Sequence, residues 1–248
     1  MNELINFNFD GLKKLVYREI SQQQQLERVE RRNQLVKFGV EAPKYLLEPE
    51  IKNLFSFVEN YNELMLLKTL WFTGARISEA LMLTPSNFSF GIQTCLMTLP
   101  TQKRKKLVKR ETYTENGVKK TKNIYEKKMY FRNIQLFKSN ETQREYLEDL
   151  NRYIVTNKIA KNDLIFKYSR FQVNRFITKA QKLAEKNGIT FPFDITPHTF
   201  RHSCAMNLYY NRIDEKVIQE FLGHSRIENT QKYTRIFHLE NDLSHVDF

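Results

Sequence analysis

Residues 196–236 read TPHTFRHSCAMNLYYNRIDEKVIQEFLGHSRIENTQKYTRI, and this stretch decides both the fold and the chemistry. Thr196-Pro197 is typical of a helix start, with Thr as the N-cap and Pro at the first helical position. Asp214 begins a second expected helix, and Leu222-Gly223 ends it because glycine lets the chain turn sharply. A third helix is expected near residues 226–236. The pattern predicts a connected group of helices.

Four side chains of this stretch suit the binding or attack of a phosphate group. His198 and Arg201 are three residues apart and share a helix face near an N-terminus, where free N–H groups and the helix dipole favour an anion. His224 follows the glycine turn, and Tyr233 lies nine residues further along. A guanidinium never loses its charge near neutral pH and holds phosphate with two prongs. We therefore expect a phosphate-directed site here.

Upstream, a second arginine occupies a similar position. Thr73-Gly74 ends an apolar helical pattern, Arg76 begins the next expected helix over residues 77–83, and Glu79 lies one turn on, able to orient Arg76. Apolar spacing and breakers predict the other helices at about residues 10–38, 48–74, 140–157 and 170–187.

Residues 86–137 have a different character. Apolar and β-branched stretches at Ile92–Leu99 and Met129–Leu136 flank a polar, lysine-rich middle with Asn116-Gly117 at its centre. Asn-Gly between two strand-like arms is a strong hairpin signal. The sequence predicts a small antiparallel sheet with a long basic hairpin over residues 100–136. The expected fold class is therefore mainly α with a small antiparallel β-sheet (α+β).

Composition narrows the class of protein. The 248 residues carry 40 Lys and Arg against 28 Asp and Glu, a formal net charge of +12, which favours a polyanionic partner such as nucleic acid or an anionic membrane surface. The most apolar stretch, residues 64–72, is too short to span a bilayer, and the N-terminus lacks the features of a secretion signal. Two cysteines cannot form a disulfide framework. A soluble, cytoplasmic protein is expected.

The positive charge is concentrated in one segment. Residues 102–132 hold twelve Lys or Arg and three Glu, a net of +9, so the other 217 residues carry only +3. Cations interleaved with tyrosines favour contact with a nucleic-acid backbone. The candidate DNA-binding residues of this segment are Arg104, Lys105, Lys106, Lys109 and Arg110.

Together the motifs TGARISEAL, HTFRH, LGH and the later Tyr233 resemble the tyrosine recombinase (phage integrase) family, over about residues 45–240. The resemblance implies a site-specific recombinase, in which Tyr233 attacks the scissile phosphate to give a 3′-phosphotyrosyl link and a free 5′-hydroxyl. It also implies that Arg76, Arg201 and His224 stabilise the phosphate, with His198 as the candidate base. Bond energy is kept in the phosphotyrosyl link, so neither a metal nor a nucleotide cofactor is expected.

The resemblance further implies a lysine in the turn of the small sheet, acting as general acid on the leaving 5′ oxygen. Lys103 is favoured because it lies closest to the end of the first strand, and Lys105 and Lys106 stay open as alternatives. Spacing alone does not decide among them.

The expected organisation has two parts. Residues 1–44 form a short N-terminal helical extension, a reduced clamp or arm, where family members usually carry a larger helical domain. Residues 45–248 form the catalytic domain with its basic hairpin and a C-terminal tail that can dock on a neighbouring protomer. The expected partner is double-stranded DNA with paired recombination sites, on which the protein assembles as a tetramer, without a membrane.

Two other functions share part of this pattern. A type IB topoisomerase uses a similar residue set without choosing a site, and a degenerate relative would bind DNA without cleaving it. A zinc site at His198 and His202 is disfavoured because no third ligand is evident. Tyr209 and Tyr210 match the nucleophile only in residue type, and their apolar neighbours indicate core positions.

Overall fold

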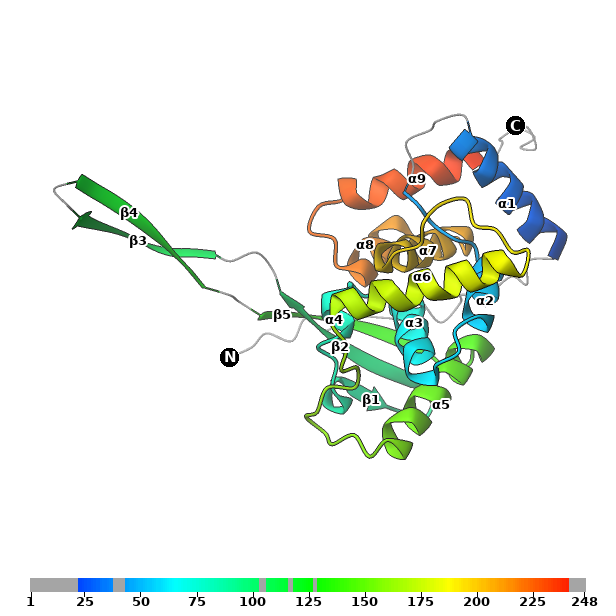
Figure 1. The fold of residues 1–248 in the computed structure, drawn as a ribbon, viewed down its shortest axis with the longest axis horizontal. Helices are drawn as coiled ribbons and strands as arrows, with labels where there is room; N and C mark the ends of the chain where they lie inside the picture. Colours follow the sequence, from blue (N-terminus) through cyan, green and yellow to red (C-terminus); the bar gives the residue numbers. More distant parts are fainter. Residues whose placement is uncertain (1–21, 38–42, 103–105, 116–117, 127–128, 241–248) are drawn as a thin grey trace.

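The computed structural model describes residues 22–37, 43–102, 106–115, 118–126 and 129–240. These ranges are mainly helical, with a few strands (Figure 1). The helices are α1 (Gln22–Lys37), α2 (Glu48–Ser56), α3 (Tyr61–Thr73), α4 (Ile77–Ala80), α5 (Glu141–Thr156), α6 (Arg170–Lys186), α7 (Pro197–Tyr210), α8 (Glu215–Leu222) and α9 (Glu228–Glu240), with a 3-10 turn, η2, at Pro85–Asn87. The predicted α+β fold class is confirmed.

The strands form two separate antiparallel sheets. Their bounds are β1 (Phe88–Phe90), β2 (Thr94–Gln102), β3 (Lys106–Glu115), β4 (Val118–Glu126) and β5 (Met129–Phe137). The first sheet has the order β1-β2-β5, and β3 pairs with β4 alone. This β3–β4 ribbon projects away from the helical body (Figure 1). The turn predicted at Asn116-Gly117 lies outside the described residues.

Helix α4 is shorter than the sequence predicts. A helix is expected over residues 77–83, but the regular helix ends at Ala80, and the N–H of Leu83 donates to the Ala80 carbonyl at 3.2 Å in a tighter turn. Thr84 precedes Pro85, and a residue before proline avoids the α conformation. The chain therefore turns early into the sheet.

Two groups of buried apolar side chains hold the elements together. The larger group lies between the sheet and the helices packed on it, and it includes Leu66, Leu70, Met97, Leu99, Ile134, Leu147, Ile177 and Phe200. The smaller group joins α7, α8 and α9 to the segment before α2, and it includes Tyr45, Leu47, Met206, Tyr209, Ile218, Leu222, Tyr233 and Ile236. The predicted nucleophile thus belongs to the second core.

A buried arginine is among the contacts that hold helix α1 on the rest of the molecule. Arg32 donates to the Tyr45 carbonyl at 2.6 Å and forms an ion pair with Glu50 of α2 at 2.6 Å. The Arg32 side chain is only 2% exposed, and a buried charge is strongly destabilising unless opposite charges and hydrogen-bond acceptors compensate it. The part of the predicted N-terminal extension that the structure describes therefore packs on the core, while the boundary at residue 44 stays a prediction. None of the described helices is long and apolar enough to cross a membrane.

Candidate active site

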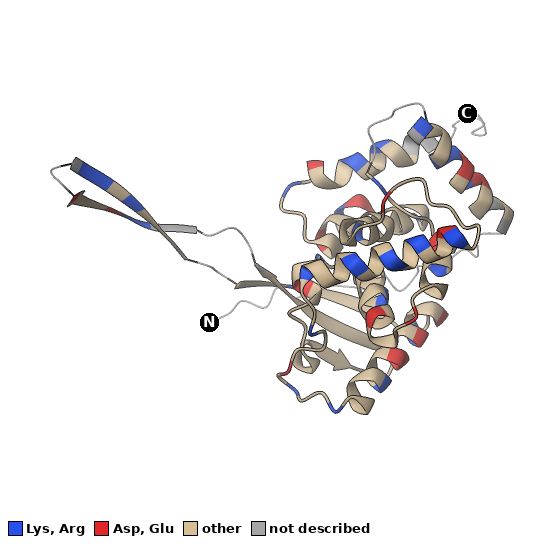
Figure 2. Cartoon of the chain, viewed as in Figure 1, with Lys and Arg blue, Asp and Glu red and all other residues tan. Residues whose placement is uncertain are grey.

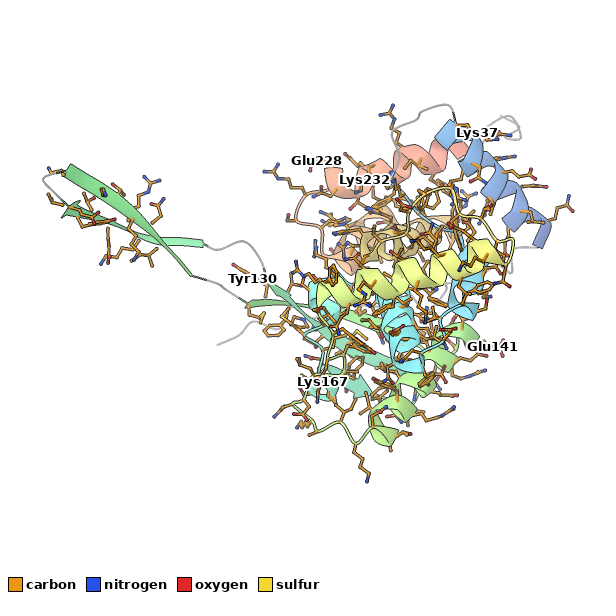
Figure 3. The ribbon with its side chains drawn as sticks, viewed as in Figure 1. Lys37, Tyr130, Glu141, Lys167, Glu228 and Lys232 are labelled. Atoms are coloured by element: carbon orange, nitrogen blue, oxygen red, sulfur yellow. The ribbon has the colours of Figure 1, made fainter. Side chains whose placement is uncertain are left out.

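Tyr233 lies on α9 with its side chain completely buried. Its hydroxyl is 2.6 Å from Nδ1 of His202 on α7, a hydrogen bond between the two side chains. The His224 ring lies nearly parallel to the phenol at an interplanar angle of 9° and a centroid distance of 6.4 Å. Lys232, labelled in Figure 3, holds its Nζ 5.0 Å from the centroid of the phenol ring. The phenol is therefore surrounded by imidazoles and cations.

The packing of α9 explains why this tyrosine points inward. Thr230, Tyr233 and Ile236 recur at helical spacing and are all buried against α7 and α8. Burial raises the pKa of Tyr233 above the usual value of 10, and Arg201 only partly opposes that rise. In this DNA-free arrangement the phenol is protonated at neutral pH.

Arg201 joins the two loops that carry the other predicted phosphate ligands. It is buried, and its guanidinium donates to the Gly74 carbonyl and to the Leu222 carbonyl, each at 2.6 Å. Gly74 ends α3 just before Arg76, and Leu222 ends α8 just before the turn to His224. Burial, followed by the charge of Arg76, lowers the pKa of Arg201 to about 9, so it stays charged at pH 7.

Gly74 has a positive φ of 56° at the end of α3, a conformation that favours glycine. A Cβ there would meet Leu222 Cδ2 at 2.8 Å and Cys204 Sγ at 3.2 Å. The glycine thus lets the loop before Arg76 lie directly on α7 and the end of α8.

His224 is positioned by a hydrogen bond within the α8–α9 connection. Its Nδ1 is 2.8 Å from the hydroxyl of Thr230, which is itself buried. Burial, followed by the charges of Arg201 and Arg76, lowers the pKa of His224 to about 3, so the ring is neutral at pH 7. When Nδ1 accepts from the threonine hydroxyl, the proton of the neutral ring is on Nε2. Nε2 can then donate to a phosphate oxygen.

Arg76 is oriented by Glu79, as the sequence predicts. The backbone N–H of Arg76 donates to Glu79 Oε2 at 2.9 Å, and its guanidinium donates to Oε1 at 2.8 Å. The Arg76 side chain is 35% exposed, whereas that of Glu79 is 1% exposed. The buried Glu79 carboxylate thus holds the Arg76 guanidinium in place, while that guanidinium stays accessible to solvent.

Glu79 has two further partners, both from the β2–β5 sheet. Thr101 donates to Oε1 at 2.9 Å, and Arg132 donates to Oε2 at 3.1 Å. Arg132 also donates to the Phe221 carbonyl near the end of α8. Burial alone would raise the pKa of Glu79, but the charges of Arg132 and Arg76 and the bond from the Arg76 N–H leave it below its usual value. Glu79 therefore stays ionised and links α4, the sheet and α8.

The sequence contains no indication of a role for Arg132, and it indicates that His202 is a packing residue or a support for residues that contact the substrate. Arg132 is opposite Leu99, whose side chain is buried, so the register of the sheet turns this charge inward. The sequence does contain a feature that could have indicated a role for His202. It is four residues from His198, so both rings lie on the same face of the helix. Their ring centroids lie 6.4 Å apart.

His198, the predicted base, is exposed in the first turn of α7. Among the described residues it is His202, one turn further along, that contacts the Tyr233 hydroxyl. Burial, followed by the charge of Lys232, lowers the pKa of His202 to about 3, so this ring is neutral at pH 7. The structure thus brings Tyr233, Arg201, His224 and His202 together.

The predicted lysines and arginines of the hairpin divide into two sets. Lys103, the favoured general acid, lies outside the described residues together with Arg104 and Lys105, and Lys106 is described only by its backbone at the start of β3. Lys109 and Arg110 are exposed on the β3–β4 ribbon. Thr101, which contacts Glu79, is two residues before Lys103, so the end of β2 reaches the site.

No set of three or more His, Cys, Asp or Glu side chains that could hold a metal ion is found among the described residues. Tyr209 is buried, and its hydroxyl lies 2.8 Å from that of Thr234. Tyr210 is buried as well, as core positions require.

The sequence of residues 44–240 matches the model of the phage integrase family. This match covers well over half of the chain. The chain belongs to the phage integrase family. A resolvase of Escherichia coli is 34% identical over 216 residues, which cover 83% of this chain and 78% of that protein. The predicted family and enzyme class, a tyrosine site-specific recombinase, are confirmed.

Solved structures of family members have the same fold. A complex of the XerH site-specific recombinase with its difH substrate, before cleavage, has a TM-score of 0.55 and 20% identity, covering 78% of this chain and 50% of that one. The Tn1549 transposon integrase with transposon right end DNA has a TM-score of 0.55 and 19% identity, covering 78% of this chain and 62% of that one. This chain thus spans half to about three fifths of those chains.

Proposed function

We propose that this protein cleaves and rejoins DNA strands at specific sites through a covalent link to Tyr233. The observation that carries the proposal is that Tyr233, Arg76, Arg201 and the neutral His224 lie in one small region. Arg201 bonds both the loop before Arg76 and the residue before the turn to His224. Related proteins solved with DNA, XerH and the Tn1549 integrase, support duplex DNA as the substrate.

The proposed reaction is one displacement at phosphorus. The phenol oxygen of Tyr233 forms a bond to the scissile phosphorus, and the bond from phosphorus to the 5′ oxygen breaks. The phenol loses its proton, and the departing 5′ oxygen takes one, for which Lys103 is the predicted donor. The products are a 3′-phosphotyrosyl link and a free 5′-hydroxyl. Attack by a 5′-hydroxyl of the partner strand reverses these steps and rejoins the DNA.

Each polar group has a distinct part in this scheme. Arg76 and Arg201 bind the non-bridging oxygens and offset the charge that develops on them. His224 donates from Nε2, because Thr230 orients its other nitrogen. His202 holds the phenol, and its low pKa makes it a hydrogen-bond partner rather than a strong base in the DNA-free protein. The base role of His198 stays a prediction for the DNA-bound state.

Strand exchange between two DNA sites requires more than one copy of the protein. Exchange between two sites needs four strands cleaved in pairs, so we propose a tetramer on paired sites in the cytoplasm. Residues 1–44 act in this proposal as a reduced clamp, and the C-terminal tail docks on a neighbouring protomer. Nothing in the scheme requires a metal or a nucleotide cofactor, and Arg104, Lys105, Lys106, Lys109 and Arg110 supply DNA contacts.

Nicked duplexes that carry candidate sites test the proposal. When the nick lies just past the scissile phosphate, the short strand diffuses away after cleavage and the covalent protein–DNA adduct accumulates on a denaturing gel. We expect an adduct with wild type and none with Tyr233→Phe, whereas Tyr210→Phe, at another buried tyrosine, retains it. Addition of EDTA should leave the adduct unchanged.

Three outcomes would contradict the proposal. An equal lack of adduct from wild type and Tyr233→Phe on every site would remove the cleavage activity and favour a DNA-binding regulator. Relaxation of an arbitrary supercoiled plasmid without exchange between paired sites would indicate a topoisomerase. Strict dependence of cleavage on a divalent metal would contradict the proposed chemistry.

A further inference from the structure

The β3–β4 ribbon is long enough to reach well beyond the active site. Its pairing runs from Lys106 opposite Glu126 to Glu115 opposite Val118. At about 3.3 Å per residue, ten residues of β3 extend roughly 30 Å. The ribbon projects from the helical body, and both of its faces are open to solvent along most of this length (Figure 1).

The register sorts the ribbon's side chains into two faces, because residues directly opposite in antiparallel strands point the same way. One face, here named the hydroxyl face, consists of Arg110 opposite Asn123, Thr112 opposite Thr121 and Thr114 opposite Lys119. The other, here named the ion-pair face, consists of Lys109, Glu111, Tyr113, Glu115, Lys120, Lys122 and Ile124.

The two faces differ in charge. On the ion-pair face, Lys109 bonds Glu111 at 2.9 Å and Lys120 bonds Glu115 at 2.7 Å. Both carboxylates of the described ribbon between Lys109 and Ile124 are therefore on this face. The hydroxyl face has two cations and no carboxylate, and the structure shows no ion pair for Arg110 or Lys119 within its described part.

We propose that the hydroxyl face of the ribbon is the surface that enters the major groove of duplex DNA, while the ion-pair face points away from it. Of the two residues with described side chains that are predicted to contact DNA, this proposal keeps Arg110 and places Lys109 on the face turned away from the duplex. The proposal rests on the DNA-recombinase function proposed above and specifies how its basic hairpin binds. A polyanion meets cations and neutral polar groups but no carboxylate on the hydroxyl face, whereas it would meet Glu111 and Glu115 on the other.

The side chains of the hydroxyl face also suit base edges. The major groove of B-DNA is about 12 Å wide and admits a two-stranded ribbon. Arginine pairs with guanine O6 and N7, asparagine pairs with adenine, and threonine offers both a hydroxyl and a methyl group for thymine. From Arg110 to Thr114 the face extends about 13 Å, roughly four base-pair steps. The ribbon therefore has the means to read a short sequence at a distance from the cleaved phosphate.

Two double variants, each losing two positive charges to threonine, separate the faces. Arg110→Thr with Lys119→Thr alters the hydroxyl face, and Lys120→Thr with Lys122→Thr alters the ion-pair face. Threonine keeps a high strand propensity, so the ribbon should stay paired. Binding is measured by fluorescence anisotropy on a labelled duplex of about 40 base pairs of mixed sequence, in a Tyr233→Phe background, which prevents covalent capture.

We expect the first double variant to weaken binding at least about tenfold and the second by less than about threefold. Guanine N7 atoms that wild type protects from dimethyl sulfate should become reactive only with the first variant. Equal weakening by both variants would overturn the proposal, because net charge alone would then explain binding. Unchanged binding with both would also overturn it, since the ribbon would not contact DNA.

A parallel assay separates this proposal from the function on which it rests. The same double variants, with Tyr233 restored, are tested for adduct formation on nicked DNA at saturating protein. An adduct from wild type, with no difference in DNA affinity between the two double variants, overturns the ribbon proposal alone. Absence of any adduct from wild type contradicts the recombinase function itself.

Discussion

At the scale of single residues, the buried carboxylate of Glu79 connects several side chains of the site. It receives Arg76 from α4, Thr101 from β2 and Arg132 from β5, and its side chain is 1% exposed. A buried ion pair is weak evidence of net stabilisation, but loss of one partner leaves the other charge buried and uncompensated. The role of Glu79 is therefore to hold two arginines in one geometry.

Replacement of Glu79 with Gln should lower the free energy of unfolding by about 3 kcal/mol, because Arg132 keeps its charge in a buried place. Urea denaturation at pH 7 measures the change, with Glu148→Gln at an exposed position of α5 as the control. The pKa of Glu79 is lowered in the folded state, so its stabilisation is present above pH 4.5 and is lost as the pH falls further. A loss no larger than that of the control would contradict this role.

His202 should make the stability of the DNA-free protein depend on pH between 6.5 and 5. Its folded pKa is about 3 and its unfolded value is near 6.5, so in this range only the unfolded state takes up the proton. Stability should fall as the pH drops, by up to about 1.4 kcal/mol per pH unit from this residue. Denaturation curves of wild type and His202→Asn at several pH values measure the difference in slope. An imidazole NMR signal of His202 that titrates near pH 6.5 would show that the ring is not buried as described.

At the scale of elements, the end of α8 sets the position of His224. Gly223 has a positive φ of 66° and follows the Leu222 carbonyl that accepts from Arg201. A Cβ at Gly223 would lie 2.6 Å from Cδ of Arg132. The end of α8, Arg132 of the sheet and the bond from Arg201 therefore meet beside one glycine.

Gly223→Ala should destabilise the protein more than Gly188→Ala does. Both glycines have positive φ, which costs a residue with a Cβ about 1–2 kcal/mol, but nothing lies within 4 Å of a Cβ at Gly188. The excess at Gly223 measures its contact with Arg132. Thermal unfolding of both variants checks this prediction, and equal shifts in the two midpoints would argue against close packing at the end of α8.

Removal of the ribbon tests its part in DNA binding as a unit. Deletion of Lys109–Lys127, closed by a short Asn-Gly turn, should weaken binding to duplex DNA and reduce the slope of log affinity against log salt, because fewer counterions are released. The helical circular dichroism should be unchanged, since the ribbon is separate from both core groups. Unchanged affinity and salt slope would mean that the ribbon is only a solvated loop.

At the scale of the whole molecule, charge is distributed unevenly. Residues 102–132 carry a net charge of +9, of which β3 and β4 hold six Lys or Arg and three Glu, a net of +3, and Figure 2 shows lysines and arginines along β4, away from the helical body. The two arginines predicted to bind the phosphate, Arg76 and Arg201, belong in contrast to the helical body, where Arg201 also bonds the loop before Arg76 and the end of α8. The proposed DNA contacts of the ribbon and the proposed phosphate site thus have separate places in the fold.

Much of this organisation is predictable from the sequence because it depends on local spacing. Arg201, His224 and Tyr233 are found from helix starts, a glycine turn and a nine-residue interval. The choice between His198 and His202 is not, because both share one face of α7 and only the packing of α9 decides which ring reaches the phenol. Arg132 depends likewise on the register between β2 and β5, which the sequence does not state.

Tyr233, buried here against His202, is proposed to become the covalent link to DNA. Mass spectrometry of the trapped adduct, after digestion of the DNA and proteolysis of the protein, identifies the residue that carries the link. We expect a nucleotide phosphate on the peptide that contains Tyr233, and on no other tyrosine. A nucleotide attached to Tyr209, Tyr210 or any residue other than Tyr233 would contradict it.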